Sequence, residues 1–347
     1  MPLSLLDISN SLRNPNVCVK VPDLEGGHAV MYNNNIVSSA GGYCVVYKYQ
    51  LANGTYKALR IWHKDLSLLP DLPEIAQKVS EELTELQSPY FVDYKYFEKG
   101  ILVKGQFFPV VVMDWCEGED LKDFITSHIT NPQIIKDVAY QFKQMVEYFH
   151  KKNISHGDLQ HGNIRIKQDG KICVLDYDSM YVPALNGKVE YIKGLPSFQH
   201  PTARERNKNL NPKVDYFSEY VIYLSLLLIA YDPSIWTEEV KKKDDILLFD
   251  IEDLKRINIP QSLLFKYRHV TDDKIDWIIK DLQSFLSEDD LNKFKPLEKH
   301  GLSLTFLPGD PSAHRNGSNR KSPQATQIAK VDVKMLISGL GAKGKSK

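Results

Sequence analysis

Three polar side chains at fixed spacing form the part of this sequence best suited to chemistry. Asn163 lies five residues beyond Asp158, and Asp176 lies eighteen beyond it. A carboxylate can accept or orient the proton of a hydroxyl group, while a second carboxylate and an amide oxygen can hold a divalent cation. Any one of these residues alone would usually cap a loop. Three such residues at these spacings are less readily explained as separate loop caps.

The segments around these residues resemble a known family. HGDLQHGN at 156–163 and LDYD at 175–178 resemble the catalytic loop and the metal-binding loop of the protein-kinase superfamily. The resemblance implies that Asp158 orients the substrate hydroxyl. It also implies that Asn163 and Asp176 hold Mg²⁺, or alternatively Mn²⁺, against the phosphates of ATP.

Further residues of the two loops receive roles from the same resemblance. Gln160 is assigned to the catalytic group. Asp178 is interpreted either as another metal ligand or as a turn or N-cap acid. Gly157 replaces the Arg that usually precedes the catalytic Asp, so a phosphorylated loop would find no partner there. We therefore predict that loop phosphorylation does not switch this protein.

Two later stretches extend the resemblance toward the C-terminus. GLPSFQHP at 194–201 resembles the end of a kinase activation segment. KVDYFS at 213–218 resembles the stretch that follows it in the family. The resemblance implies that Asp215 braces the backbone of the catalytic loop.

The expected nucleotide site combines a strand hairpin with the linker between two lobes. VVVMDWCEGEDL at 110–121 resembles the kinase hinge, which implies a gatekeeper residue, backbone contacts to adenine and a ribose-binding acid. The phosphate loop retains two adjacent glycines, although the family usually has three. The residues assigned to the nucleotide are Gly41, Gly42, Val46, Ala58, Arg60, Met113, Asp114, Cys116 and Asp120.

Arg60 stands near the position where the family has a lysine. Because side chains alternate along a strand, Arg60 shares a face with Ala58, which is expected to pack on adenine. We predict that Arg60 is the catalytic cation that faces the phosphates. The usual glutamate position on the following helix falls on Val79, and Glu81 or Glu82 would serve only if the helix were shifted.

Hydrophobic periodicity and turn signals predict the elements that position these residues. Turns at Asn53-Gly54 and Lys104-Gly105 predict antiparallel strands, and apolar spacing predicts one helix over 73–86. Farther along, helices are predicted over 121–128 and 132–152 and from Asp215. They are interrupted by a hairpin with its turn at Asp169-Gly170. The resulting fold class is α+β, a two-lobed protein-kinase-like fold with a β-rich N-lobe and a mainly helical C-lobe.

This reading divides the chain into four parts. They are an N-terminal extension (1–35), the N-lobe (36–115), the C-lobe (116–300) and a linker with a basic tail (301–347). Residues 313–347 hold eight Lys or Arg and one acid, Asp332. The tail is either a solvated, disordered end or an arm that docks on a partner or on the acidic body.

Composition restricts the class of protein. The 347 residues include 44 basic and 44 acidic side chains, and 42% are hydrophobic, which excludes collagen-like and wholly disordered chains. Zero net charge gives no electrostatic case for nucleic acid or an anionic membrane as partner. The four scattered cysteines and the absence of a signal-like N-terminus favour free thiols and a cytoplasmic location.

Three functions follow from these observations. The leading one is an ATP- and Mg²⁺-dependent serine/threonine kinase of the bacterial eukaryotic-like kind, acting on a protein substrate. A pseudokinase that binds nucleotide or a regulatory partner is the first alternative, suggested by Arg60, the altered glycine loop and a charged Arg165 at the expected floor of the adenine pocket. A small-molecule kinase is the second alternative. The HGDL…N and D-x-D patterns, which contain Gly157 and Asp178, resemble those of the aminoglycoside and choline kinases.

Overall fold

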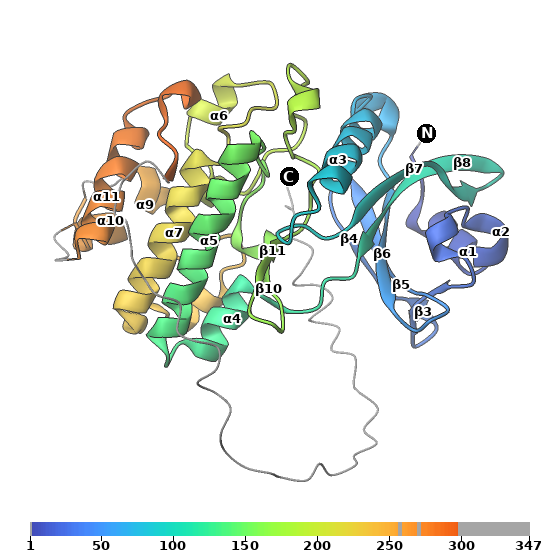
Figure 1. The fold of residues 1–347 in the computed structure, drawn as a ribbon, viewed down its shortest axis with the longest axis horizontal. Helices are drawn as coiled ribbons and strands as arrows, with labels where there is room; N and C mark the ends of the chain where they lie inside the picture. Colours follow the sequence, from blue (N-terminus) through green and yellow to red (C-terminus); the bar gives the residue numbers. More distant parts are fainter. Residues whose placement is uncertain (1, 256–258, 269–271, 298–347) are drawn as a thin grey trace, which may run out of the picture.

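A computed structural model describes residues 2–255, 259–268 and 272–297. A lobe built on a β-sheet and a helical lobe lie side by side, joined by the chain that follows strand β8 (Figure 1). This arrangement confirms the two-lobed α+β fold predicted from the sequence. The basic tail at 301–347 lies outside the described residues.

The sheet of the N-lobe is antiparallel. Within the described residues its order is β1-β5-β6-β8-β7, with β4 paired to β5. Both predicted hairpins are confirmed, since Gly54 joins β5 to β6 and Gly105 joins β7 to β8, each with positive φ. The strands are β1 (His28–Ala29), β4 (Ser38–Ala40), β5 (Cys44–Gln50), β6 (Tyr56–Trp62), β7 (Tyr94–Val103) and β8 (Gln106–Asp114).

Helix α3 (Leu72–Leu86) crosses this lobe on the side that faces the helical lobe (Figure 1). It begins one residue before the predicted helix. Its apolar stripe, which includes Ile75, Val79 and Leu83, is buried in the larger of two hydrophobic clusters. The helix thereby lies between the sheet and the loops that carry the chemical residues.

The N-terminal residues cover the opposite face of the sheet. Helices α1 (Leu5–Leu12) and α2 (Pro15–Cys18) lead into the short strands β1, β2 (Met31–Tyr32) and β3 (Asn35–Ile36). Ile8 is fully buried in the second hydrophobic cluster, together with inward side chains of β5, β6 and β8. This packing removes one face of the sheet from water and leaves the other for the interlobe site.

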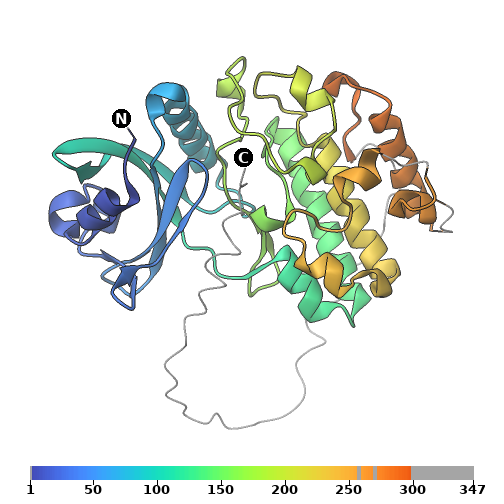
Figure 2. The ribbon, with the colours of Figure 1, turned by 180° about the vertical axis from the view of Figure 1, so that it is seen from behind.

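The helical lobe is built around two long helices, α5 (Pro132–Lys152) and α7 (Tyr216–Tyr231), which pack against each other (Figures 1 and 2). Helix α7 follows Asp215, where a helix was predicted, and it is buried on nearly all sides. No helix in the described ranges is long and apolar enough to cross a membrane. The helices are α4 (Leu121–His128), α5 (Pro132–Lys152), α6 (Ala203–Arg206), α7 (Tyr216–Tyr231), α8 (Glu238–Lys242), α9 (Ile251–Lys255), α10 (Leu263–Lys266) and α11 (Asp273–Leu286).

A small sheet lies where the lobes meet. Strand β10 (Ile164–Ile166) pairs with both β9 (Glu119–Asp120) and β11 (Ile172–Val174). The predicted turn at Asp169-Gly170 joins β10 to β11. The sheet therefore connects the end of the hinge to the two loops that carry Asn163 and Asp176.

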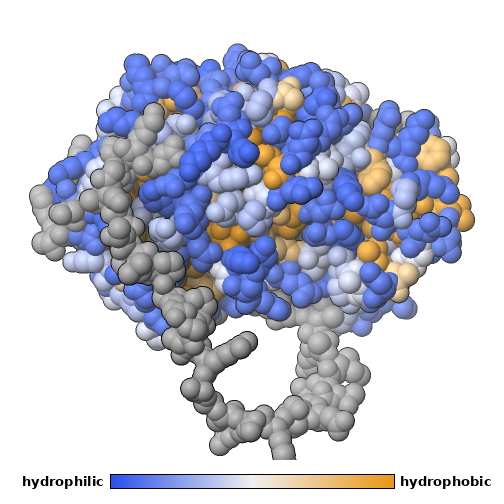
Figure 3. Space-filling view, in the orientation of Figure 1, coloured by the Kyte–Doolittle hydropathy of each residue, from blue (hydrophilic) through white to orange (hydrophobic). Residues whose placement is uncertain are grey.

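Hydrophilic side chains dominate the face of the molecule in Figure 3. Apolar side chains gather at the N-lobe end, where Leu6 and Val17 of the N-terminal helices are strongly exposed.

Candidate active site

Asp215 fixes the backbone of the catalytic loop, residues 156–163. Its carboxylate accepts hydrogen bonds from the backbone N–H groups of His156 and Gly157, the latter at 3.0 Å. Asp215 is 2% exposed and stands at the N-cap of α7. Charge-assisted bonds to two adjacent amides define the local chain direction. The bracing role expected for Asp215 is therefore present in the structure.

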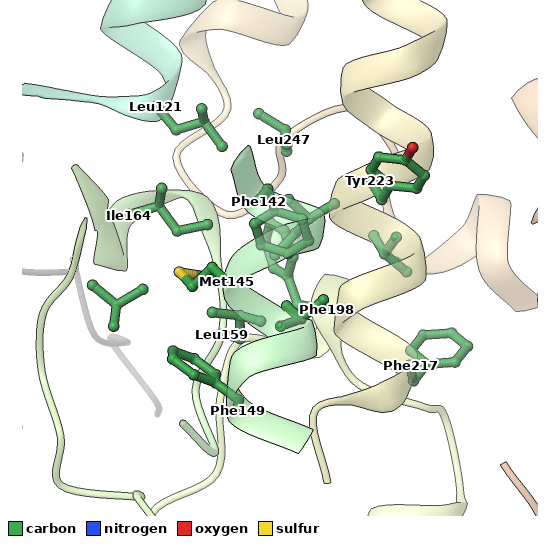
Figure 4. Close-up of a cluster of buried hydrophobic side chains, with 14 of the residues drawn as sticks. Leu121, Phe142, Met145, Phe149, Leu159, Ile164, Phe198, Phe217, Tyr223 and Leu247 are labelled. Atoms are coloured by element: carbon green, nitrogen blue, oxygen red, sulfur yellow. The ribbon is translucent and has the colours of Figure 1, made fainter. Parts of the chain in front are cut away.

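The loop contains one position that only glycine fits. Gly157 has φ +77°, and a Cβ there would collide with the backbone carbonyl of Ser179. Next to Asp158, the side chain of Leu159 enters a cluster with Phe142, Met145 and Phe198 (Figure 4). The replacement of the usual Arg by Gly157 thus has a steric reason that the sequence alone did not reveal.

The three chemical residues are brought together by short hydrogen bonds. Asn163 Nδ2 donates to the backbone oxygen of Asp158 at 2.7 Å. The backbone oxygen of Asn163 accepts from the N–H of Leu175, the residue before Asp176, at 2.8 Å. His156 Nε2 donates to the Leu175 carbonyl at 2.8 Å. The catalytic loop and the metal-binding loop (175–178) are therefore joined as one unit.

Asp158 is almost completely enclosed, with 1% of its surface exposed. The backbone of Gly194 passes close to its carboxylate, since a Cβ at this glycine would lie 2.5 Å from both Asp158 Oδ1 and Gln199 Nε2. Glycine at 194 therefore permits a close approach of the chain to the carboxylate of Asp158.

Arg60 forms an ion-pair triad with the two acids of the metal-binding loop. Its Nη1 lies 2.9 Å from Asp176 Oδ1, and its Nη2 pairs with Asp178 Oδ2. The side chains of Arg60 and Asp178 are 4% and 5% exposed, against 23% for Asp176. Burial opposes the guanidinium charge, but Asp178, Cys44 and Asp176 raise the pKa of Arg60 well above its usual value.

Asn163 and Asp176 suit a metal ion that also binds a phosphate ligand. Among the residues with described structure, no three His, Cys, Asp or Glu side chains form a ready-made cage. Mg²⁺ is usually held by one or two protein oxygens and the phosphates of its nucleotide. Because Asn163 donates through its nitrogen, its side-chain oxygen keeps its acceptor capacity, and the carboxylate of Asp176 is the most exposed of the triad. The donor set therefore fits Mg²⁺ or Mn²⁺.

Comparison with known families agrees with this geometry. The model of the protein kinase domain matches residues 40–288, most of the chain.

The chain belongs to the protein kinase domain family.

Similar proteins include serine/threonine-protein kinases from several eukaryotes. The kinase CST20 of Candida albicans is 27% identical over 132 residues, which is 38% of this chain and 10% of that protein. The kinase STE20 of Eremothecium gossypii is 24% identical over 219 residues, or 62% of this chain and 22% of that protein. The kinase pakG of Dictyostelium discoideum is 26% identical over 174 residues, or 47% and 14%. The matches thus span a quarter or less of these longer relatives.

Three residues predicted to contact the nucleotide lie on one face of the N-lobe sheet. Ala58 of β6 is directly opposite Met113 of β8, and Val46 of β5 is directly opposite Arg60. Val46, Ala58 and Met113 are each about 5% exposed and belong to the cluster shared with α3 and the C-lobe. The structure therefore brings these predicted residues together on the interlobe face.

The phosphate loop is closed by its own backbone. Gly41 N–H donates to the carbonyl of Cys44 at 2.8 Å, and His63 Nε2 donates to the carbonyl of Gly41 at 3.1 Å. A Cβ at Gly42 would meet nothing within 4 Å. Burial raises the pKa of the Cys44 thiol to about 12, so this thiol stays protonated at neutral pH.

Asp114 and Asp120, two of the residues predicted to bind nucleotide, make different contacts. Asp114 is exposed and pairs with Lys57. Asp120 is 5% exposed and caps helix α4 by accepting from the N–H of Asp123 at 2.9 Å. Burial and the neighbouring Asp120 raise the pKa of Asp123. The carboxylate expected to contact ribose is thus also the N-cap of α4.

Arg165 occupies the floor position without reaching solvent. It lies directly opposite Asp120 of β9 and Cys173 of β11, is 7% exposed, and donates to the Gly118 carbonyl at 3.5 Å. Cys173 Sγ lies 3.0 Å from Cys116 Sγ in the hinge, although both cysteines are free thiols. The position predicted as the floor is therefore polar, and a close thiol pair lies beside it.

Arg204 of helix α6 supports the catalytic loop. Helix α6 directly follows the activation segment, residues 179–201. Sequence reasoning missed this residue. Its guanidinium donates to the carbonyl of Gly157 at 2.5 Å and pairs with Glu190 at 2.7 Å, and both side chains are buried. Arg204 also donates to Gln199 Oε1. No local signal marks it, because its partners lie 5 to 47 residues away.

The same segment is tied to the N-lobe through helix α3. Lys188 Nζ lies 2.6 Å from Glu74 Oε2, and Tyr191 donates to Asp71 at 2.8 Å. These unmodified side chains link the activation segment to the start of α3.

Two other loop residues, Gln160 and His161, are buried. Gln160, which the resemblance placed in the catalytic group, is 2% exposed, and its side-chain oxygen lies close to Gly162. His161 packs against the ring of Phe198, with centroids 5.4 Å apart. Burial, followed by the charge of Lys122, lowers the pKa of His161 to about 3.

Proposed function

We propose that this chain is an active serine/threonine protein kinase that transfers the γ-phosphoryl group of ATP to a protein hydroxyl. The observation that carries this proposal is the joined set of Asp158, Asn163 and Asp176, with the loop backbone braced by Asp215. A fold kept only for binding has no chemical need for all of these residues. The similarity to serine/threonine kinases supports protein as the substrate class.

The residues of this chain have distinct tasks in the proposed reaction. The acceptor oxygen bonds to the γ-phosphorus, the bond to the β–γ bridging oxygen breaks, and the hydroxyl proton passes to Asp158. Asn163 holds the backbone of Asp158 in place, and with Asp176 supplies oxygens for the metal ion. When bound there, a Mg²⁺ ion would neutralise phosphate charge. Arg60 adds a fixed positive charge on the N-lobe side.

A labelled phosphate-transfer assay tests the proposal. The purified chain is incubated with ATP labelled at the γ-phosphate, Mg²⁺ or Mn²⁺, and a panel of Ser- and Thr-containing proteins. We expect transfer by the wild type and a loss of about 10²–10⁴-fold in Asp158→Asn, because the general base is removed. Asp169→Asn, which changes an exposed turn acid, is the matched control and keeps full activity. A silent wild type with both metals and all substrates contradicts the proposal.

A nucleotide-binding pseudokinase is the second candidate. It is favoured by Arg60, whose ion pairs engage both acids of the metal-binding loop. Thermal denaturation with ATP and Mg²⁺ separates two versions of this candidate, since ligand at 100 times its dissociation constant adds about 2.7 kcal/mol of stability. Stabilisation by ATP without phosphate transfer supports a nucleotide-binding pseudokinase. The absence of both stabilisation and transfer supports a scaffold.

Other parts of the proposal rest on sequence patterns alone. The bacterial eukaryotic-like subgroup rests on the HGDL and DYD variants, and the eukaryotic relatives lend it no support. The small-molecule alternative rests on Gly157 and Asp178, and Asp178 pairs with Arg60. A cytoplasmic location and tail docking remain predictions. Truncation at Leu307 with unchanged activity and partner binding would favour the solvated tail.

A further inference from the structure

Arg60 has no acidic partner at the expected position on helix α3. That position is Val79, which is fully buried among apolar side chains. Glu81 instead accepts from Gln77 at 3.0 Å and pairs with Lys78 at 2.7 Å on the exposed side of the helix. The helix is therefore not shifted in a way that brings Glu81 to Arg60.

The acid that pairs with Arg60 comes from the metal-binding loop instead of α3. Asp178 pairs with Arg60 Nη2, and both side chains are buried. The residues on either side of Asp178 are fixed. Tyr177 donates to the Val174 carbonyl at 2.7 Å, and Ser179 donates to the Ile192 carbonyl at 3.0 Å. Asp178 is therefore held in place by its neighbours and is not a mobile surface acid.

The guanidinium keeps donors for a ligand while it binds both acids. An arginine offers five N–H groups, and the two ion pairs use one N–H each on Nη1 and Nη2. A buried carboxylate at Nη2 also offsets the cost of desolvating the cation. Such a pair can hold Arg60 in one orientation toward phosphate oxygens.

We propose that Asp178 is a positioning residue that orients Arg60 toward the nucleotide phosphates, in the place of an acid on α3, and is not a second metal ligand. This inference rests on the proposed nucleotide-dependent function. In this arrangement the residue that orients Arg60 lies on the metal-binding loop, whereas the family pattern places it on α3. A second ion pair, through Nη1, holds Asp176 beside Arg60.

The test compares ATP affinity with metal dependence in Asp178→Asn and Asp178→Glu. A fluorescent ATP analogue is titrated against each protein in EDTA and again in Mg²⁺. We expect Asp178→Asn to weaken binding about tenfold or more under both conditions, because an ionic hydrogen bond is lost. Asp178→Glu restores part of the affinity. The Mg²⁺ concentration at half-maximal transfer changes less than twofold.

A double variant and a control make the test specific. Arg60→Met/Asp178→Asn is expected to bind ATP no more weakly than Arg60→Met, because the two residues act through one contact. Glu81→Gln on α3 is expected to match the wild type. Circular dichroism checks that each variant folds, and Asp178→Glu serves if the Asn variant does not.

The outcomes separate this inference from the proposed function. Unchanged ATP affinity in Asp178→Asn overturns the positioning role and leaves the kinase function standing. A large rise in the Mg²⁺ requirement with unchanged affinity in EDTA also overturns it and identifies a metal ligand. A wild type that binds no nucleotide overturns the inference together with the proposed function.

A separate observation concerns the thiol pair under the hinge. Cys116 Sγ and Cys173 Sγ lie 3.0 Å apart, and a disulfide bond needs about 2.05 Å. Cys116 is partly exposed, whereas Cys173 is fully buried. The hydrogen bond from Cys173 lowers the pKa of Cys116 against the effect of burial, and Arg165 and Lys167 lower it further. Cys116 is therefore the thiol that a small oxidant reaches first.

The geometry points to Cys116 and Cys173 as a disulfide-forming pair that hydrogen peroxide oxidises. The Cys116 thiolate attacks a peroxide oxygen, the O–O bond breaks, and protonation of the departing hydroxide gives water and a sulfenic acid. The sulfur of Cys173 then attacks that of Cys116, the S–O bond breaks, and a second water leaves with the thiol proton. Two thiols and one peroxide thus yield one disulfide and two waters.

Intact mass spectrometry of the peroxide-treated chain of 347 residues tests this pair. We expect a loss of about 2 Da, reversed by dithiothreitol, and a peptide map that joins Cys116 to Cys173. Cys116→Ser and Cys173→Ser should each abolish the loss, whereas Cys18→Ser should keep it. An unchanged mass, or a gain of oxygen on Cys116 with no cross-link, overturns the proposal.

Discussion

The catalytic loop of the C-lobe and the phosphate-facing side of the N-lobe keep the family pattern to different degrees. In the loop, Asp158 and Asn163 retain their places and are tied by a 2.7 Å hydrogen bond. In the N-lobe, Arg60 replaces lysine and Val79 replaces the helix acid. Backbone-directed contacts demand one geometry, whereas a fixed charge can be held by an acid from another element. The catalytic loop therefore tolerates little change, whereas the phosphate-facing side of the N-lobe holds its positive charge with different residues.

The strongest challenge to this comparison is Asp215→Asn. The buried carboxylate accepts from two backbone amides, and an asparagine cannot reproduce both charged contacts. We expect about 2–4 kcal/mol of lost stability and at least a hundredfold loss of transfer. Urea denaturation and the transfer assay measure the two effects. Near-normal activity in a folded variant would show that the loop does not depend on this brace.

Gly157→Ala sharpens the same side of the comparison, with Gly170→Ala as its control. Both glycines have φ near +77°, but a Cβ at Gly157 meets the Ser179 carbonyl, while one at Gly170 meets nothing within 4 Å. We expect a cost of about 1 kcal/mol at Gly170 from backbone strain, and about 3 kcal/mol or more at Gly157. Equal losses in unfolding free energy would remove the steric explanation for Gly157.

His161 provides a pH test of the loop. Burial lowers its pKa to about 3, below the usual 6.5, so the unfolded state binds the proton more readily. The stability from neutral His161 is present above pH 6.5 and is lost as pH falls below it. Its share of the slope is at most about 1.4 kcal/mol per pH unit.

Chemical denaturation between pH 7 and pH 4 measures that share. His161→Phe, which keeps an aromatic ring against Phe198, should flatten the decline. Substitution of the exposed His28 by Gln should not. An identical slope in the wild type and His161→Phe would contradict the buried, neutral state of His161.

The smallest effect is expected at the serines of the activation segment. Ser179 and Ser197 are 2% and 4% exposed, and the Gly157 carbonyl is already bound by Arg204. Ser179→Ala should cost about 1 kcal/mol because one hydrogen bond is lost. Transfer by the Ser179→Ala/Ser197→Ala protein should stay within about twofold of the wild type. Loss of activity in a folded double variant would contradict a segment that needs no phosphate.

The sequence predicted the elements better than the contacts between them. Helices α4 and α5 begin and end at the predicted residues, because Pro132 opens α5 and the apolar period runs without a break. The hairpin turns were recognisable from Asn-Gly and Lys-Gly pairs for similar local reasons. Local signals of this kind act over a few residues.

The ion pairs of the site could not be predicted in the same way. Arg60 and Asp178 are 118 residues apart, and nothing near either residue marks the partner. Arg204 likewise reaches Gly157 across 47 residues. The resemblance to kinases located Asp158, Asn163 and Asp176, because their spacing is local. It could not assign Asp178, whose role depends on the packing of both lobes.

A crystal structure with a non-hydrolysable ATP analogue and Mg²⁺ tests the account most directly. We predict that Arg60 contacts a phosphate oxygen and keeps its pair with Asp178, while Asn163 and Asp176 ligate the metal ion. An analogue bound away from Arg60, or a metal ion held by Asp178 with Arg60 displaced, would contradict the account.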